Sequence, residues 1–247
     1  MAFCTSTHLS TTRLFLKNEI RWQCSKIPLL YRSTYGLKPK NRRLLPKAYT
    51  SFLIDGAPRS GNTYAASIIE VMLPHIHFSH HQHNFANILF ASSLRIPILI
   101  IYRNPRQSIL SNLVRDPCLF PPQAARLWIS YYKHLLKLPH IHFLAFEQLC
   151  SRPVSSLNKF FTSASLQYQI PPIDDRLGNA IAEHQRSIDD VEEGLSNVHR
   201  SSMPTSEKVA ISEQYSLLLD SLPNKYQRAF DVVYGDLCAR SLVLTDG

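Results

Sequence analysis

Short, mostly apolar runs alternate along this chain with longer stretches in which apolar residues recur every three or four positions. Three runs are typical of short buried strands, at residues 51–56, 96–102 and 141–146. Helical spacing covers residues 64–73, 105–115, 123–136, 154–163, 174–194 and 206–240, with a break near Pro223. Strands that alternate with helices predict a parallel α/β sheet, and ligands of such sheets bind at the carboxyl ends of the strands.

The positive charge of the chain lies in its first 50 residues. The chain carries 27 Lys and Arg against 18 Asp and Glu, a formal charge of +9. Ten of these bases and a single acid, Glu19, fall within residues 1–50, so the body from residue 51 onward is neutral. A nucleic-acid-binding domain usually spreads its basic residues over the folded body. We therefore expect a basic arm (1–50), one folded domain (51–247) and no nucleic-acid partner.

The composition of the arm leaves two interpretations open. It is rich in Ser, Thr, Lys and Arg and nearly free of acids, as organelle transit peptides are, or it is a basic extension with a short helix near residues 11–22. The sequence contains no run of about 18 apolar residues, so we expect no transmembrane helix. The five cysteines are scattered and odd in number, which favours a reducing compartment. We expect a cytoplasmic protein or, if the arm is a targeting sequence, an organellar one.

The first strand runs into a loop of the kind that binds phosphate. The loop reads Gly56-Ala57-Pro58-Arg59-Ser60-Gly61-Asn62-Thr63, and a helix follows it. Glycines let backbone N–H groups approach an anion, and the helix N-terminus adds the positive end of its dipole. The spacing matches the nucleotide-hydrolase pattern G-x-x-x-x-G-K-[ST], except that Asn62 replaces the lysine and the positive charge stands at Arg59.

A second anion-binding pattern follows the central strand. Arg103-Asn104-Pro105 comes directly after the apolar run, and Ser111 stands two helical turns further along. Metal-dependent nucleotide hydrolases usually place an acid at the end of a neighbouring strand, but an arginine cannot hold a metal ion. Its planar fork suits a phosphate instead. Together with Arg59, this pattern predicts a ligand that carries two separate phosphate-like groups.

These two patterns resemble those of the sulfotransferases that use 3'-phosphoadenosine-5'-phosphosulfate (PAPS). Residues 58–63 are similar to the family's 5'-phosphosulfate loop P-[KR]-S-G-T-T, and Arg103-Asn104-Pro105 with Ser111 is similar to its 3'-phosphate motif. Residues 146–149 and 233–237 resemble two further family segments, so the likeness extends from about residue 51 to 237. It implies a three-layer α/β/α fold of the P-loop-containing nucleotide-binding type, with a central parallel sheet and a helical C-terminal part.

The resemblance also implies roles for individual residues. Ser60, Gly61, Asn62 and Thr63 would cradle the 5' group, with an amide where the family usually has a first threonine. Arg59 would neutralise the charge that builds on the bridging oxygen as the sulfuryl group departs. Arg103 and Ser111 would hold the 3'-phosphate, and no metal would be required. The acceptor would be a small molecule with a hydroxyl or an amine.

The general base is expected among the histidines of the segment His77-Phe78-Ser79-His80-His81-Gln82-His83. The family's interval before the R-N-P arginine indicates His81, with His83 and His80 as substitutes, although Ser79 stands near the place of the family's lysine. Four close histidines could instead bind zinc or nickel, but no cysteine or carboxylate stands nearby. Arg200 lies in a stretch that takes the place of the family's C-terminal R-K-G-x-x-G segment, but this stretch has no glycine. We expect Arg200 to reach the 3'-phosphate, or else to be an exposed loop residue.

Two other functions stay open at this point. A P-loop kinase for small molecules would share the loop, but the missing lysine and the presence of Arg103 disfavour it. A non-catalytic protein that has kept only its nucleotide site would fit the altered C-terminal segment. Aromatic residues such as Trp128, Tyr131 and Tyr132 could line an acceptor pocket, but their helical spacing favours a place in the core.

Overall fold

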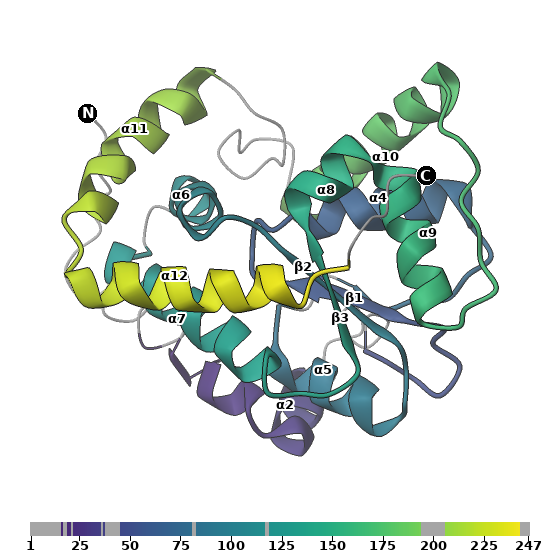
Figure 1. Ribbon diagram of the computed structural model, residues 1–247, viewed down its shortest axis with the longest axis horizontal. Helices are drawn as coiled ribbons and strands as arrows, with labels where there is room; N and C mark the ends of the chain where they lie inside the picture. The colour runs from purple at the N-terminus through teal and green to yellow at the C-terminus, as the bar shows by residue number, and fades with distance from the viewer. Residues whose placement is uncertain are drawn as a thin grey trace.

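Three parallel strands form the centre of the structure, a computed structural model that describes residues 16, 19–20, 22–35, 37, 45–80, 83–116, 119–193 and 206–242 (Figure 1). Strands β1 (Leu53–Gly56), β2 (Ile98–Tyr102) and β3 (Ile141–Ala145) are hydrogen-bonded in that order. Every residue of β2 is buried, as its uninterrupted apolar sequence predicts for a central parallel strand. Because all three strands point the same way, their carboxyl ends meet at one edge of the sheet.

Helices make up most of the remaining described chain. In chain order they are α2 (Pro28–Tyr35), α4 (Asn62–Met72), α5 (Phe85–Ser93), α6 (Pro105–Arg115), α7 (Pro121–Leu135), α8 (Phe146–Ser151), α9 (Pro153–Ser163), α10 (Asp175–Glu193), α11 (Ser206–Asp220) and α12 (Asn224–Ala239). In the described residues, no helix is both long and apolar enough to span a bilayer.

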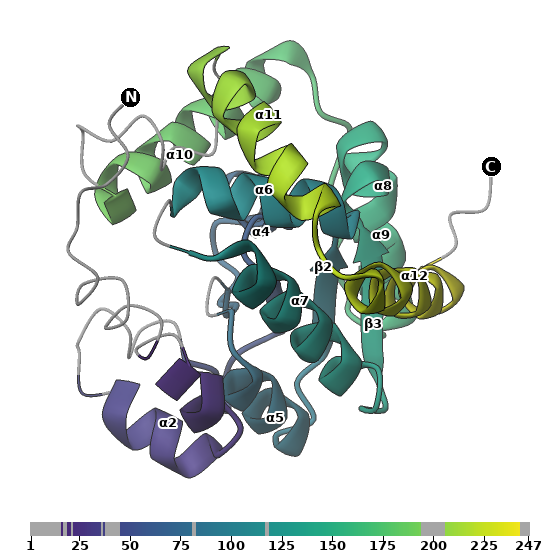
Figure 2. The same cartoon turned by 90° about the vertical axis from the view of Figure 1, so that its left-hand side faces the viewer.

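The two faces of the sheet pack against different helices, because side chains alternate along each strand. On one face, Leu53, Ile100 and Phe143 belong to a core cluster with residues of α5, α6, α7 and α12. On the other face, Ile101 and Leu144 pack with residues of α4, α8, α9 and α10. Figures 1 and 2 show the sheet between these two groups of helices. The mixed α/β class and the buried parallel sheet agree with the sequence prediction.

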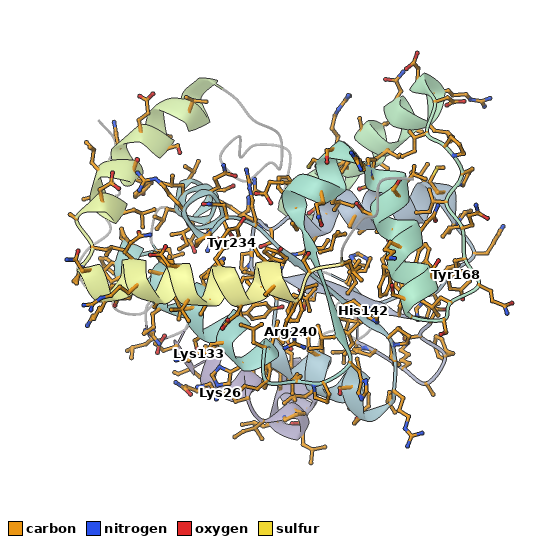
Figure 3. The ribbon with its side chains drawn as sticks, viewed as in Figure 1. Lys26, Lys133, His142, Tyr168, Tyr234 and Arg240 are labelled. Atoms are coloured by element: carbon orange, nitrogen blue, oxygen red, sulfur yellow. The ribbon has the colours of Figure 1, made fainter. Side chains whose placement is uncertain are left out.

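Single bridges extend the sheet beyond its outer strands. Ser79 pairs with Leu53 at one edge, and Ser241 pairs with Phe143 at the other, both in parallel. Arg240, which Figure 3 labels near the end of α12, places its guanidinium 5.0 Å from the centre of the Phe143 ring. The histidine segment and the residues that follow α12 therefore both join the sheet.

Most element boundaries agree with the sequence to within two residues. Helix α6 has the predicted bounds, because Pro105 opens it and the Asn104 side chain accepts the N–H of Gln107 as a cap. Strand β2 begins at Ile98 and not at residue 96, since the preceding Pro97 has no N–H to donate to a neighbouring strand. Helix α4 begins two residues earlier than its apolar pattern indicated, directly after the loop.

The structure adds α2, α5 and α8, which the apolar spacing did not predict. Helix α5 is apolar on most sides and so shows no stripe, but Asn84 caps it by accepting the N–H of Asn87. Helix α2 packs against α5. The short helix expected near residues 11–22 is helical at the described residues 16, 19–20 and 22–25, and Trp22 is buried in the core. Its remaining residues lie outside the described part.

Candidate functional site

Two glycines shape the loop between β1 and α4. A Cβ on Gly56 would lie 2.2 Å from the carbonyl oxygen of Ile101, so only glycine lets the end of β1 lie this close to β2. Gly61 has a left-handed φ of 95°, and a Cβ there would meet the Phe146 ring at 2.3 Å. Each glycine is required by its surroundings, and together they keep the loop against the strand ends.

Helix α4 begins within this loop, so its N-terminus faces the loop backbone. Gly61 occupies the N-cap position, and no side chain caps the helix there. The first N–H groups of a helix have no partner within it and carry the positive end of the helix dipole. An anion at the loop would therefore gain both hydrogen bonds and a favourable field from α4.

Tyr132 of α7 supports the loop from below. Its buried hydroxyl donates to the carbonyl oxygen of Ile101 at 2.9 Å and accepts the backbone N–H of Ala57 at 3.1 Å. The Ser60 Oγ lies 2.9 Å from the same hydroxyl. Because the phenolic hydrogen already points to a carbonyl, Ser60 must be the donor. Burial raises the pKa of Tyr132, so the phenol stays protonated.

Asn62 closes the loop through its amide. The Nδ2 donates weakly to the carbonyl oxygens of Gly56 at 3.4 Å and Ala57 at 3.3 Å, and the side chain is buried. Its Oδ1 has no hydrogen-bond partner. The amide therefore stabilises the loop itself. Both Ser60 and Asn62 turn their side chains inward, which leaves backbone groups and Arg59 as the parts of the loop suited to an anion.

Arg59 connects the loop to the second motif. Its Nε donates to the Oγ of Ser111 over 3.0 Å, and Ser108 Oγ donates to the carbonyl oxygen of Pro58 over 3.2 Å. Both serines project from the same face of α6. Arg59 itself has a φ of 68°, a left-handed conformation that costs energy in a residue other than glycine. The loop and α6 therefore form one unit.

Arg103 and the loop share an aromatic neighbour. The Arg103 guanidinium lies 4.6 Å from the centre of the Phe146 ring, and its Nε donates to Gln107 Oε1 over 3.2 Å. The same ring fills the space beside Gly61. Burial lowers the pKa of Arg103, although the charges of Glu147 and Cys150 oppose this shift. Phe146 thus stands between the loop and the arginine and sets their separation.

The histidine segment turns His80 away from the loop. Its Nε2 lies 3.2 Å from Oε1 of Glu70 in α4, and Nε2 of His184 in α10 lies 3.4 Å from Oε2 of the same carboxylate. Burial raises the pKa of Glu70, but the hydrogen bond and charge of His80 and the charge of His184 outweigh it and lower that pKa overall. Glu70 therefore joins α4, the histidine segment and α10.

His83 lies directly against the loop. Its Nδ1 is 2.9 Å from the carbonyl oxygen of Gly56, and its backbone N–H donates to Oδ1 of Asp55 over 3.0 Å. A carbonyl only accepts hydrogen bonds, so this contact puts the proton of a neutral ring on Nδ1 and the lone pair on Nε2. The Asp55 carboxylate, 3.4 Å from Nδ1, further orients the ring.

Three buried residues on β1, α5 and α7 carry polar atoms without a partner. Oδ2 of Asp55, both amide atoms of Asn87 and the hydroxyl of Tyr131 have no hydrogen-bond partner. All three residues are at most 3% exposed. Burial, with a further contribution from the Asp55 charge, raises the pKa of Tyr131. Such atoms are costly in a core unless a polar group pairs with them. An acid inside an otherwise apolar strand was the one sequence signal for this group.

The structure brings together most of the residues predicted for the site. Residues 59–63 and Ser111 surround the N-terminus of α4, and Arg103 faces them across Phe146. His81 and Arg200 lie outside the described residues. Tyr131, Tyr132 and Trp128 are buried, in agreement with their interpretation as core. Within the described residues, no group of three or more His, Cys, Asp or Glu side chains is arranged to hold a metal ion.

Comparisons with known proteins give likenesses among solved structures alone. No protein-family model matches the chain, and no curated protein matches it. Among solved structures, the chain is similar to the crystal structure of a mouse sulfotransferase, SULT7A1, complexed with PAP. The two are 14% identical, the match covers 80% of this chain and 86% of that one, and the TM-score is 0.39. A likeness at this level leaves the function of this chain to be argued from its own residues.

Proposed function

We propose that this chain is a sulfotransferase that uses PAPS as donor and transfers the sulfuryl group to a hydroxyl or an amine of a small molecule. The contact between its two motifs carries the proposal: Arg59 Nε donates to Ser111 Oγ over 3.0 Å. Phe146 supports the same arrangement by lying against both Gly61 and Arg103. Two arginines and a helix N-terminus without a side-chain cap suit a ligand with two separate anionic groups.

The two ends of the donor would be bound by different elements. The backbone of residues 60–63 at the start of α4 would bind the 5' group, while Arg103 would bind the 3'-phosphate with Ser111 beside it. A 3'-phosphate distinguishes PAPS from ATP, so Arg103 would supply the selectivity. Arg200 would add a further cation to the 3'-phosphate.

PAPS supplies an activated sulfuryl group: the acceptor atom forms a bond to sulfur, and the bond from sulfur to the bridging phosphate oxygen breaks. Transfers of this loose kind depend on positioning and on stabilising charge. Arg59 would neutralise the charge that develops on the bridging oxygen. The hydrogen bond to Ser111 would fix the position of the Arg59 guanidinium beside the loop.

A histidine would take the proton of the acceptor. His80 is paired with Glu70, so His81 and His83 are the remaining candidates for the base. Of these, His83 has the supporting geometry, because its contact with the Gly56 carbonyl leaves the lone pair on Nε2. We therefore propose His83 as the base, with His81 as the alternative.

Calorimetric titration with adenosine 3',5'-bisphosphate tests the donor site. We expect binding in the presence of a chelator, weaker binding of 5'-AMP, and a loss of roughly a hundredfold in affinity for Arg103→Ala. Arg106→Ala is the matched control, since Arg106 directly follows the Arg103-Asn104-Pro105 motif but is paired with Asp220 on α11. A preference for ATP with Mg²⁺ would instead support a kinase, and failure to bind either nucleotide would reject both enzymes.

Turnover of PAPS with simple phenols and amines then tests the base. His83→Asn keeps an amide donor for the Gly56 carbonyl but removes the base, so we expect turnover to fall by about a hundredfold or more with unchanged bisphosphate affinity. His81→Ala should retain most of its turnover. The reverse result would assign the base to His81.

A further inference from the structure

Exposed apolar side chains are concentrated in the N-terminal arm. Six of the thirteen large hydrophobic residues that are exposed in the described part of the chain fall within residues 16–37. They are Leu16, Ile20, Ile27, Leu29, Leu30 and Leu37. Leu29 and Leu37 are 81% and 80% exposed, the highest values of the set. Scattered exposed leucines are ordinary, but a concentration of this kind marks an interaction surface.

The arm has a buried side and an exposed apolar side. Trp22 and Tyr31 are buried, and α2 packs against α5. Leu16 and Ile20 are one helical turn apart and both are exposed, as are the neighbours Leu29 and Leu30 of α2. Trp22 and Tyr31 therefore pack the arm onto the body. The exposed apolar residues of the arm are not needed for this packing and face outward.

The charge of the arm indicates which kind of partner its outward apolar surface would bind. Ten Lys and Arg and one acid occupy residues 1–50, and that acid, Glu19, is paired with Arg126 of α7. Four of the bases, Lys17, Arg21, Lys26 and Arg32, alternate with the apolar residues of the arm. Apolar side chains interleaved with Lys and Arg are the pattern of segments that lie in the interface of an anionic bilayer.

The position of the arm agrees with such an attachment. Figures 1 and 2 both place α2 at the end of the molecule opposite α8 and α11, and Figure 3 shows Lys26 at that same end. The loop of the candidate site lies toward α6 and α8, which follow the carboxyl ends of β2 and β3. A surface bound at the arm would leave the candidate site open.

We propose that residues 16–37 attach this protein to an anionic lipid surface. The apolar residues of the arm enter the headgroup region, and the basic residues pair with lipid phosphates. The described helices do not span a bilayer, so this attachment is peripheral. It is independent of the sulfotransferase proposal, since it involves none of the residues of the candidate site.

Co-sedimentation of the full chain with lipid vesicles tests the proposal. We expect binding to vesicles of phosphatidylcholine and phosphatidylglycerol, mixed at roughly three to one, much weaker binding to phosphatidylcholine alone, and release as salt is raised. The double variant Leu29→Ser/Leu37→Ser should bind the mixed vesicles at least about tenfold less well. Both side chains are exposed, so the fold should be unaffected, which circular dichroism checks.

A matched double variant separates the arm from general surface hydrophobicity. Leu217→Ser/Val232→Ser removes two other exposed residues, 74% and 63% exposed on α11 and α12, and should bind like the wild type. Equal binding to both kinds of vesicle, or full binding by the arm variant, would overturn the proposal. So would a wild type that ignores vesicles but self-associates through Leu29 and Leu37, since a second copy would then cover the surface.

Discussion

Arg59 and Ser111 are 52 positions apart in the sequence, yet the guanidinium of one donates a 3.0 Å hydrogen bond to the hydroxyl of the other. Ser111 thereby orients the arginine of the loop, a role beyond the phosphate contact that the sequence suggests. An arginine with a left-handed backbone conformation is unfavourable on its own. The bond to α6 helps to hold it there.

Ser111→Ala tests this relationship directly. Loss of one hydrogen bond to a charged group should weaken the binding of adenosine 3',5'-bisphosphate by about tenfold, as measured by calorimetry. Ser111→Thr keeps the hydroxyl and should bind nearly as well as the wild type. Equal affinities for the alanine variant and the wild type would show that Arg59 does not depend on Ser111.

Gly61→Ala should destabilise the fold. The new Cβ would meet the Phe146 ring at 2.3 Å, and the φ of 95° is unfavourable for alanine. We expect a loss of about 1–3 kcal/mol in the free energy of unfolding, measured with urea. Gly178→Ala in α10 is the control, because nothing lies within 4 Å of its Cβ position, and it should be neutral or stabilising. Equal effects of the two substitutions would contradict the close packing of the loop on Phe146.

Glu70→Gln should change how stability depends on acid. The pKa of Glu70 is lowered from its ordinary 4.5, because His80 and His184 outweigh the opposing effect of burial. A carboxyl with a lowered pKa contributes stability that is fully present above its ordinary value and is lost as pH falls through the lowered one. The wild type should therefore exceed the variant in stability at neutral pH, and this difference should shrink below pH 4.5.

Urea unfolding at a series of pH values measures that difference. The control is Glu213→Gln, which removes an exposed acid of α11 and should leave the acid dependence of the wild type in place. A difference between the wild type and Glu70→Gln that stays constant through the acid range would show that the carboxylate does not depend on its two histidines.

Local chemistry made the strands and the two anion-binding motifs predictable from the sequence. Each motif stands at the end of an apolar run, and the register of a parallel sheet brings such ends together. The support from Tyr132 was not predictable, because an aromatic residue on a helix face usually indicates core. Its bond to Ala57 crosses 75 positions of the chain. Glu70 likewise meets His184 only because α4 and α10 pack together.

Two asparagines, the partly buried Asn158 and the fully buried Asn87, differ in whether their amides have hydrogen-bond partners. Asn158 is satisfied on both sides of its amide, since Nδ2 donates to the carbonyl oxygen of Ile170 at 2.9 Å and Oδ1 accepts the Ile170 N–H at 2.7 Å. Asn87 of α5 is fully buried, and neither of its amide atoms has a partner. We expect Asn158→Leu to lower the free energy of unfolding by about 1–3 kcal/mol and Asn87→Leu to raise it by about 1–2 kcal/mol.

A fall for Asn87→Leu as large as that for Asn158→Leu would show that the Asn87 amide contributes to the fold. A more stable Asn87→Leu variant that has lost turnover but still binds the bisphosphate would place this buried amide on the acceptor side of the site, since proteins keep unfavourable buried polar groups where function needs them.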